Sequence, residues 1–209
     1  MHDPPPISLL YDRLFRQVDR EVWVVTAAHR ERRGALLATW ISQASIDPQR
    51  PYVLAGLAPN HFTTELIEAS GCFAIHLPPV DRAAEVIEFA IGSGRDRDKL
   101  AGRSLRIGAT TAPQLDEFSW RLECRVVARL DGGDRIYFWG EGVGGSIGEG
   151  TSFAPLTEQQ LVRAATPEQL DQLRTNRELD AGLHGPWFER WLGEVAAGAS
   201  RVVGEIDRD

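Results

Sequence analysis

The sequence predicts a mainly β fold of the α+β class: a small antiparallel β-barrel with short helices and a C-terminal helical extension. The clearest evidence is a hairpin, because apolar residues at the even positions of 120–130 alternate mostly with charged residues, as in a strand with one buried face. The tight-turn sequence DGGD follows at 131–134, and residues 135–140 return as the partner strand. About six strand candidates without regular β-α-β alternation argue against a doubly wound parallel sheet.

The other elements follow from local patterns along the chain. Short apolar or β-branched runs predict further strands at residues 22–26, 35–45, 52–57 and 72–77. Helical spacing and breaker residues predict helices at residues 7–18, 63–70, 80–91, 157–162, 167–179 and 186–195. We place the barrel domain at residues 1–156 and the helical extension, packed on the barrel or on a second subunit, at residues 157–209.

Composition narrows the class of protein. The 209 residues are 43% hydrophobic and suffice for one good core. A net charge of −7, with arginines alternating with acids, argues against a nucleic-acid partner. Cys72 and Cys124 stand alone, which suggests neither disulfides nor a zinc site and fits a reducing cytosol. Without a signal-peptide pattern or an apolar run of about 20 residues, the chain is expected to be cytoplasmic and not membrane-bound.

Several catalytic motifs are absent or out of context. Residues 140–145 match Gly-x-Gly-x-x-Gly, but no helix signal follows the third glycine, so we interpret these glycines as loosening a strand end or forming bulges. The histidines stand singly and no Gly-x-Ser-x-Gly elbow occurs. We therefore assign no metal site and no catalytic residue.

Polar residues within the apolar run 35–46 form the first candidate binding segment. Buried hydroxyls and amides need partners, so one interpretation is that this strand lies along a ligand with a polar ring. The alternative is a strand edge that faces solvent. The candidate residues are Thr39, Trp40, Ile41, Ser42, Gln43 and Ser45.

A second candidate segment stands at the start of the helix expected at 63–70. Free backbone N–H groups and the helix dipole favour an anion such as a phosphate there, although simple N-capping by Asn60 explains the same residues. Cations in the loop 94–99 suit a second phosphate or a pyridine dinucleotide, and equally a solvated loop. The candidates here are Asn60, His61, Phe62 and Thr63, with Arg97 and Lys99 from the loop.

Four segments, in order, resemble the flavin reductase-like family: 38–48, 60–67, 71–77 and 122–134. The motif WISQAS at 40–45 especially resembles the corresponding segment of the reductase domain attached to flavodiiron proteins. The resemblance implies a split β-barrel that binds FMN, with FAD as the other option, and a homodimer with the flavin near the subunit interface. It implies that residues 39–43 contact the isoalloxazine ring largely through backbone groups. Ser45, His61 and Thr63 would then lie towards the phosphate.

The chain departs from the family at Arg135, which follows Gly133-Asp134 where the family often has histidine. Arginine does not act as an acid at pH 7, but it holds a negative charge, so we add Arg135 to the candidate nucleotide or phosphate contacts. The C-terminal segment also lacks the basic and aromatic residues with which members of the family usually end. Flavin binding survives these changes better than turnover with NAD(P)H.

The resemblance implies an oxidoreductase of the flavin reductase type. Hydride would pass from NADH or NADPH to the flavin, and electrons onward to free flavin, oxygen or an electron-acceptor protein. Two alternatives remain: an FMN-containing electron carrier without direct use of NAD(P)H, and a non-catalytic module that binds flavin or another ligand.

Overall fold

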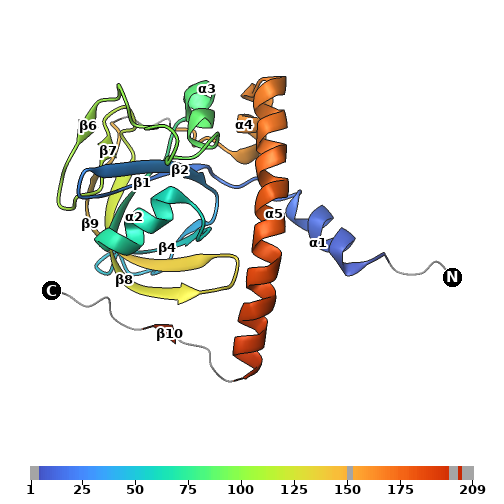
Figure 1. The fold of residues 1–209 in the computed structure, drawn as a ribbon. Coiled ribbons are helices and arrows are strands. Elements are labelled where there is room, and N and C mark those ends of the chain that lie inside the picture. Colours follow the sequence, from blue (N-terminus) through green and yellow to red (C-terminus); the bar gives the residue numbers. More distant parts are fainter. Residues whose placement is uncertain (1–4, 150–152, 198–201, 204–209) are drawn as a thin grey trace.

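The computed structural model describes residues 5–149, 153–197 and 202–203, and it confirms the antiparallel β architecture (Figure 1). Within these ranges one curled sheet contains seven strands in the order β2-β1-β5-β8-β9-β4-β3, and short β10 pairs with β8. Strands β6 and β7 form a separate small sheet. The strands are β1 Trp23–His29, β2 Arg32–Ala38, β3 Ile41–Gln43, β4 Tyr52–Leu57, β5 Cys72–His76, β6 Leu105–Arg106, β7 Gln114–Leu115, β8 Arg121–Asp131, β9 Ile136–Ser146 and β10 Val202–Val203.

The two edge strands of the large sheet, β2 and β3, are consecutive in the chain. Only Thr39 and Trp40 separate the end of β2 from the start of β3. Because consecutive Cα atoms are about 3.8 Å apart, the sheet must curl until its two edges approach each other. We call this crossing, residues 38–41, the seam; in the described chain no strand pairing joins β2 to β3 across it. The single strand expected at 35–45 is therefore wrong, because the chain leaves one edge of the sheet and enters the other.

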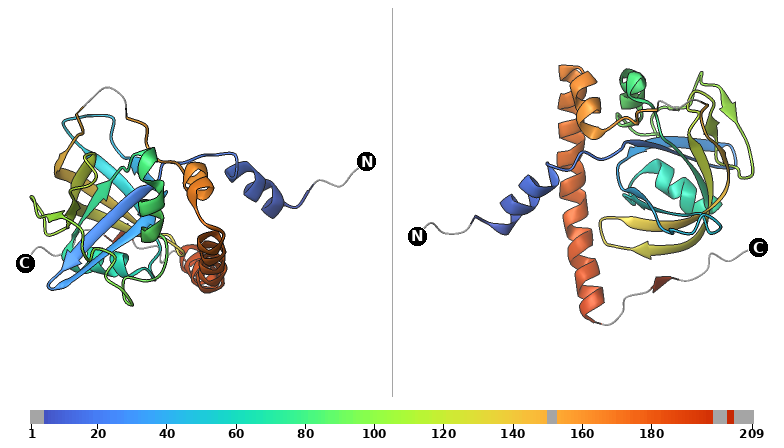
Figure 2. Two further views of the ribbon diagram at one scale, coloured as in Figure 1. Left: turned by 90° about the horizontal axis from the view of Figure 1, so that it is seen from above. Right: turned by 180° about the vertical axis from the view of Figure 1, so that it is seen from behind.

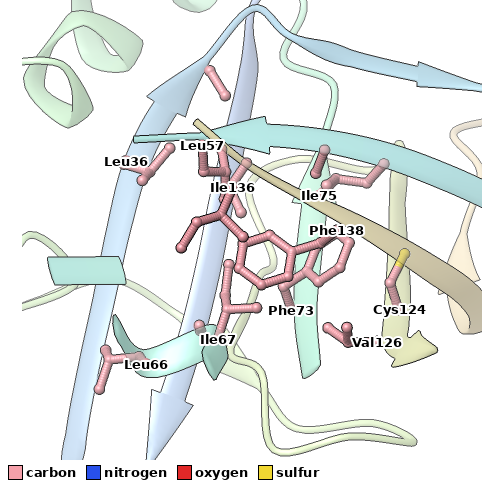
Figure 3. Close-up of a cluster of buried hydrophobic side chains, with 14 of the residues drawn as sticks. Leu36, Leu57, Leu66, Ile67, Phe73, Ile75, Cys124, Val126, Ile136 and Phe138 are labelled. Carbon is pink, nitrogen blue, oxygen red and sulfur yellow. The ribbon is translucent and has the colours of Figure 1, made fainter. Parts of the chain in front are cut away.

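Large apolar side chains fill the interior of the curled sheet. Phe73 and Phe138 are fully buried and lie together in this core (Figure 3). Helix α2, Phe62–Ser70, lies across one end of the barrel (Figure 1) and adds Leu66 and Ile67 to the same cluster. Helix α2 thus closes one end of the barrel, and the second candidate segment, at the start of α2, lies at this end.

The β8–β9 hairpin contains the predicted alternating strand, with one exception. Cys124 and Val126 are buried as expected, but Glu123, on the face predicted to be wet, is only 2% exposed. Its carboxylate accepts hydrogen bonds from the backbone N–H and the hydroxyl of Thr110, because the loop before β7 covers this face. The glycines at 140–145 lie within β9, and a register shift between Glu123 and Cys124 marks a bulge, which confirms their interpretation as strand residues.

The C-terminal helices are α4, Glu158–Ala164, and α5, Pro167–Ala196. Helix α5 runs alongside the barrel as one continuous rod (Figures 1 and 2), so the expectation of two helices at 167–179 and 186–195 is wrong. Pro186 lies inside the rod and removes one helical hydrogen bond. The helix nevertheless continues because contacts with the barrel hold it on both sides of the proline, at Asp180 and Phe188.

Two other helical segments complete the fold. Helix α1, Ile7–Phe15, forms as predicted and projects away from the barrel beyond α5 (Figure 2). The segment expected to be one helix at 80–91 is instead a succession of short turns: η1 Val80–Arg82, α3 Ala83–Val86 and η2 Ile87–Phe89. Among the described residues, no helix has both the length and the apolar character that crossing a bilayer requires. The domain boundary at 156 stays a prediction.

The histidine at the end of β5 is a structural residue. His76 is fully buried, and its Nδ1 lies 3.0 Å from the carbonyl oxygen of Val24, while Nε2 accepts from the backbone N–H of Leu115 at 3.0 Å. The imidazole is therefore neutral with its proton on Nδ1. Burial lowers the pKa of His76 to about 4.

This burial predicts a loss of stability in mild acid. Between pH 6.5 and 4 the unfolded chain binds a proton at His76 that the folded protein excludes, so the free energy of unfolding should fall by about 3 kcal/mol from this group alone. Urea unfolding at pH 7.5 and 4.5 should show a smaller loss for His76→Gln, whose amide keeps an acceptor for Leu115 but does not titrate. Equal losses in the two proteins would contradict this assignment.

Candidate functional site

The first candidate segment lies at an open edge of the sheet, where β3 pairs with β4 on one side only. The N–H of Ala44 donates to the carbonyl of Tyr52 at 2.9 Å, and that of Gly56 donates to the carbonyl of Trp40 at 2.8 Å. In an antiparallel pair such bonds alternate along the strand, so the backbone groups of Ile41 and Gln43 point to the free edge. This edge can receive the polar rim of a planar ring.

The polar side chains of this segment face outward. Ser42 and Gln43 are exposed, so the premise that they are buried and need partners is wrong, and the interpretation that a ligand lies along this strand edge stays a prediction. Gln43 donates to the carbonyl of Ser45 at 2.6 Å, and the Ser45 hydroxyl accepts from the N–H of Asp47 at 3.1 Å. These bonds shape the turn after β3. Thr39, before β3, is partly buried and belongs to the seam.

Arg135 lies against the seam. Its guanidinium carbon is 4.8 Å from the centre of the Trp40 ring, a cation–π contact. One of its nitrogens, Nη1, also donates to the carbonyl oxygen of Asp134 at 2.6 Å. The structure thus brings together two candidates 95 positions apart in sequence, a cation from the hairpin turn and an indole from the seam.

The second candidate segment begins α2, but not as predicted. The N-cap is His61, and no side chain caps the helix. The first helical bond is from Glu65 N–H to His61 O, so the backbone N–H groups of residues 62–64 lack helical partners. Phe62 and Thr63 are 7% and 2% exposed, so their side chains are packed into the barrel and do not form a binding surface. Capping by Asn60 is wrong because its side chain binds α5 instead.

A hydrogen-bond chain joins α5 to both candidate segments. Arg135 Nη1 donates to Nδ1 of His184 at 3.1 Å, since a guanidinium has no acceptor. His184 Nε2 therefore carries the imidazole proton and donates to Asn60 Oδ1 at 3.0 Å. Asn60 Nδ2 donates to Asp180 Oδ1 at 2.9 Å, and Asp180 Oδ2 lies 3.6 Å from His61 Nε2. We use the name hydrogen-bond chain for Arg135, His184, Asn60 and Asp180.

His184 in the hydrogen-bond chain and His61 beside it are both neutral at pH 7. Burial lowers the pKa of His61, and the cations Arg135 and Lys99 lower it further against the opposing effect of Asp180. Burial, then Arg135, likewise lower the pKa of His184. At neutral pH these imidazoles therefore act as hydrogen-bonding groups rather than as cations.

The two cations of the loop 94–99 have different roles. Arg97 donates to the carbonyls of Glu88 and Ile91 and so closes its own loop. Lys99 donates to the carbonyl of Phe89 at 2.7 Å, and its charge acts on His61. Burial and the neighbouring Arg97 lower the pKa of Lys99 to about 8.

Sequence reasoning missed Asp180 and His184, which come from the C-terminal extension. Their spacing of four residues on one helix places both on one face and was the available signal. His184 is only 6% exposed, one of few buried polar side chains, yet nothing local in the sequence shows which surface α5 covers.

A hollow of about 460 Å³ adjoins the hydrogen-bond chain between α5 and the barrel. The tryptophans Trp187 and Trp191, one helical turn apart, form one wall, and Asn60 reaches the other. Both tryptophans are partly buried. The remaining lining residues are Pro59, Asp131, Gly133, Arg190 and Glu194.

The arrangement suits a planar polar ring with an anionic tail. Unpaired strand backbone groups at β3 and the indole of Trp40 match a ring, and free N–H groups at the start of α2 match an anion. In the described part of the chain, no three His, Cys, Asp or Glu residues are grouped to hold a metal ion.

Residues 15–162 match the family model described as the flavin reductase like domain. A protein of Aeropyrum pernix is 36% identical over 125 residues, 56% of this chain and 46% of that protein. A diflavin flavoprotein of Synechocystis sp. is 31% identical over 116 residues, 53% of this chain and 18% of the relative, so the chain spans less than half of either. A homologue of nitrilotriacetate monooxygenase component B from Mycobacterium thermoresistibile has a similar structure, with TM-score 0.61, 27% identity and coverage of 72% and 83% of the two chains.

The contact between α5 and the hairpin turn gives a prediction at Gly133. Its φ is +85°, and an added Cβ would lie 3.0 Å from the Cα of Phe188. Gly133→Ala should therefore lower the free energy of unfolding by about 1–3 kcal/mol more than Gly71→Ala, because both carry the left-handed backbone strain but only one meets α5.

Gly71, at φ +67°, is the matched control because a Cβ there meets no atom within 4 Å. Urea unfolding of both variants measures the difference. Equal destabilisation would show that α5 does not press on the turn.

Proposed function

Because this chain belongs to the flavin reductase-like domain family, we propose that it is an oxidoreductase that binds FMN at the seam and transfers hydride from NAD(P)H to the bound flavin. The observation that carries the proposal is the meeting of three separate segments: the free edge of β3, the start of α2, and Arg135 beside Trp40. When bound, the flavin supplies the hydride and electron chemistry, and the chain supplies binding and orientation.

The ring would lie along β3. The outward backbone groups of Ile41 and Gln43 are a donor and acceptor row of the kind that a polar heterocycle matches, and Trp40 is 38% exposed beside it. Thr39 and Ser42 complete this segment from the seam and the strand. Backbone groups at the strand edge would hold the ring without help from side chains. The outward-facing side chains of Ser42 and Gln43 are therefore compatible with ring binding by this strand.

The phosphate would lie towards the start of α2. Three backbone N–H groups, at 62–64, are directed away from the helix, and a helix of nine residues presents its positive dipole end there. Lys99 and Arg135 add positive charge around His61. Ser45 closes the turn at the end of the ring segment. The same anion-binding groups suit either FMN or FAD.

A second candidate is an FMN electron carrier without direct use of NAD(P)H. The observation that favours it is the lack of an acid among the groups that meet at Arg135. Arg135 does not release its proton at pH 7, and the lowered pKa values of His61 and His184 keep both imidazoles neutral. A carrier needs no such acid, whereas a reductase gains from one.

Flavin binding is tested with the Gln43 backbone. Gln43→Pro removes an N–H at the free edge, where proline is tolerated, and should raise the Kd for FMN about tenfold or more. Gln43→Ala also loses the side chain but keeps the N–H, so it should bind FMN much more tightly than the proline variant. Fluorescence titration measures both; wild-type protein that takes up no FMN would contradict the proposed function.

The same samples separate the two candidates. NADH and NADPH are added to the FMN-loaded protein without oxygen, and absorbance follows the flavin. Rapid bleaching with either nucleotide is the result expected of a reductase and names its donor. Flavin bands that persist would identify the carrier.

We further propose that the chain forms a homodimer in the cytoplasm. Helix α1 has no buried residue, and Ile7, Leu10 and Leu14 are 80%, 46% and 64% exposed. A nine-residue helix is unstable in water without packing, so α1 needs a surface to cover its apolar side chains. An electron-acceptor protein is the other partner that such a face would fit.

Sedimentation velocity tests the dimer. Wild-type protein should sediment as a dimer, and Leu14→Glu should shift it to a monomer because it places a charge on the apolar face of α1. Arg13→Glu, on the same helix and also exposed, is the control and should leave the dimer intact. A monomeric wild-type protein would overturn the proposal.

A further inference from the structure

His184 is an imidazole from the C-terminal helix that lies between two segments of the barrel. Only 6% of it is exposed, and both ring nitrogens are used: Nδ1 accepts from Arg135 and Nε2 donates to Asn60. Its ring also packs against Trp187, with centroids 5.3 Å apart. No other described residue contacts both the cation beside the seam and the loop that begins α2 through hydrogen bonds.

We propose that His184 is a positioning residue of the flavin site, so that α5 is part of that site rather than an appendage to the barrel. Its neutral imidazole holds the guanidinium of Arg135 against Trp40 and holds the amide of Asn60 beside the start of α2. This inference rests on the proposed function, because the two groups that His184 holds belong to the ring and phosphate ends of that site.

The geometry explains why the positioning matters for Arg135. An arginine side chain has many rotamers, and ordering it is entropically costly unless several contacts fix it. Here Nη1 donates both to the Asp134 carbonyl and to His184 Nδ1, while the guanidinium lies over the Trp40 ring. Removing the imidazole leaves the contacts of the hairpin and the indole and frees the cation to rotate away from an anionic ligand.

Asn60 depends on His184 in a complementary way. Its Oδ1 accepts from His184, and its Nδ2 donates to Asp180, so both ends of the amide are fixed by residues of α5. The amide is thereby held beside the start of α2 without capping it. The carbonyl of Asn60 accepts from Arg95 at 2.9 Å, which fixes the backbone of the same residue.

The charges around His184 make this arrangement sensitive to acid. Asp180 on its own helix and Asp134 on the hairpin favour the protonated imidazole, whereas Arg135 and burial oppose it, and burial dominates. His61 in the α2 loop, itself influenced by Lys99, faces Asp180. The pKa of His184 is lowered, so protonation takes place below its ordinary value near 6.5. A protonated Nδ1 would face the Arg135 cation with a donor and break the contact.

The experiment measures FMN affinity in full-length protein. Fluorescence titrations at pH 8.0 and 5.5 compare wild type with three variants: His184→Ala, His184→Gln and Leu183→Ala. The glutamine amide keeps an acceptor for Arg135 and a donor for Asn60 but does not titrate. Leu183, the preceding residue of α5, is 50% exposed. Its alanine variant is the control for a change in α5 that leaves the hydrogen-bond chain unaltered. Circular dichroism verifies that each variant retains the folded spectrum.

At pH 8.0 we expect His184→Ala to raise the Kd for FMN about tenfold, as loss of a charge-assisted hydrogen bond implies. His184→Gln should recover most of that affinity, and Leu183→Ala should match wild type. Between pH 8.0 and 5.5 wild type should lose more affinity than His184→Gln, because only wild type has an imidazole at position 184 to protonate. His61 and the phosphate titrate in both proteins and do not distinguish them.

Two results would overturn the inference while leaving flavin binding intact. They are wild-type affinity in His184→Ala, and a glutamine variant as weak as the alanine variant. Failure of the proposed function looks different, because wild-type protein would then show no FMN uptake at either pH.

Discussion

The fold depends on how the chain crosses the seam. Strands β2 and β3 are the opposite edges of a seven-stranded sheet in the described chain, yet two residues connect them. The hydrogen bond from Gly56 N–H to the carbonyl of Trp40 fixes the crossing on the β4 side. From this constraint follow the curl of the sheet, the free edge of β3, and the position of Trp40 under Arg135. The candidate site is therefore a consequence of barrel closure rather than an addition to it.

Sequence patterns predict most of the barrel because they report local burial. The alternation along β8 and the DGGD turn locate the hairpin, and the apolar run at 52–57 coincides with β4. The failures have physical causes. The run at 35–45 mixes apolar and polar residues without a break signal such as Gly or Pro, so its pattern does not reveal where the chain changes sheet edge. Glu123 looks solvated because its burial comes from a loop that hydrogen-bonds it from 13 positions away.

The candidate site was predictable only in its local parts. The segments around Thr39 and Asn60 stand out because polar groups occur where apolar ones or a helix start are expected. Asp180 and His184 do not stand out, since their role depends on α5 docking across Asn60 at separations of 120 and 124 residues. Pro186 makes the course of α5 harder to predict, because a proline in the sequence predicts a helix boundary, whereas tertiary contacts keep this helix continuous.

The open seam also has a thermodynamic consequence. A ligand lying along the β3 edge would supply backbone partners that the sheet itself leaves unpaired, and it would do so only in the folded barrel. Any molecule that binds the native state alone raises the free energy of unfolding in proportion to the logarithm of its concentration above Kd. Barrel closure and ligand occupancy would then be linked by mass action, and the apparent melting temperature would report cellular ligand supply.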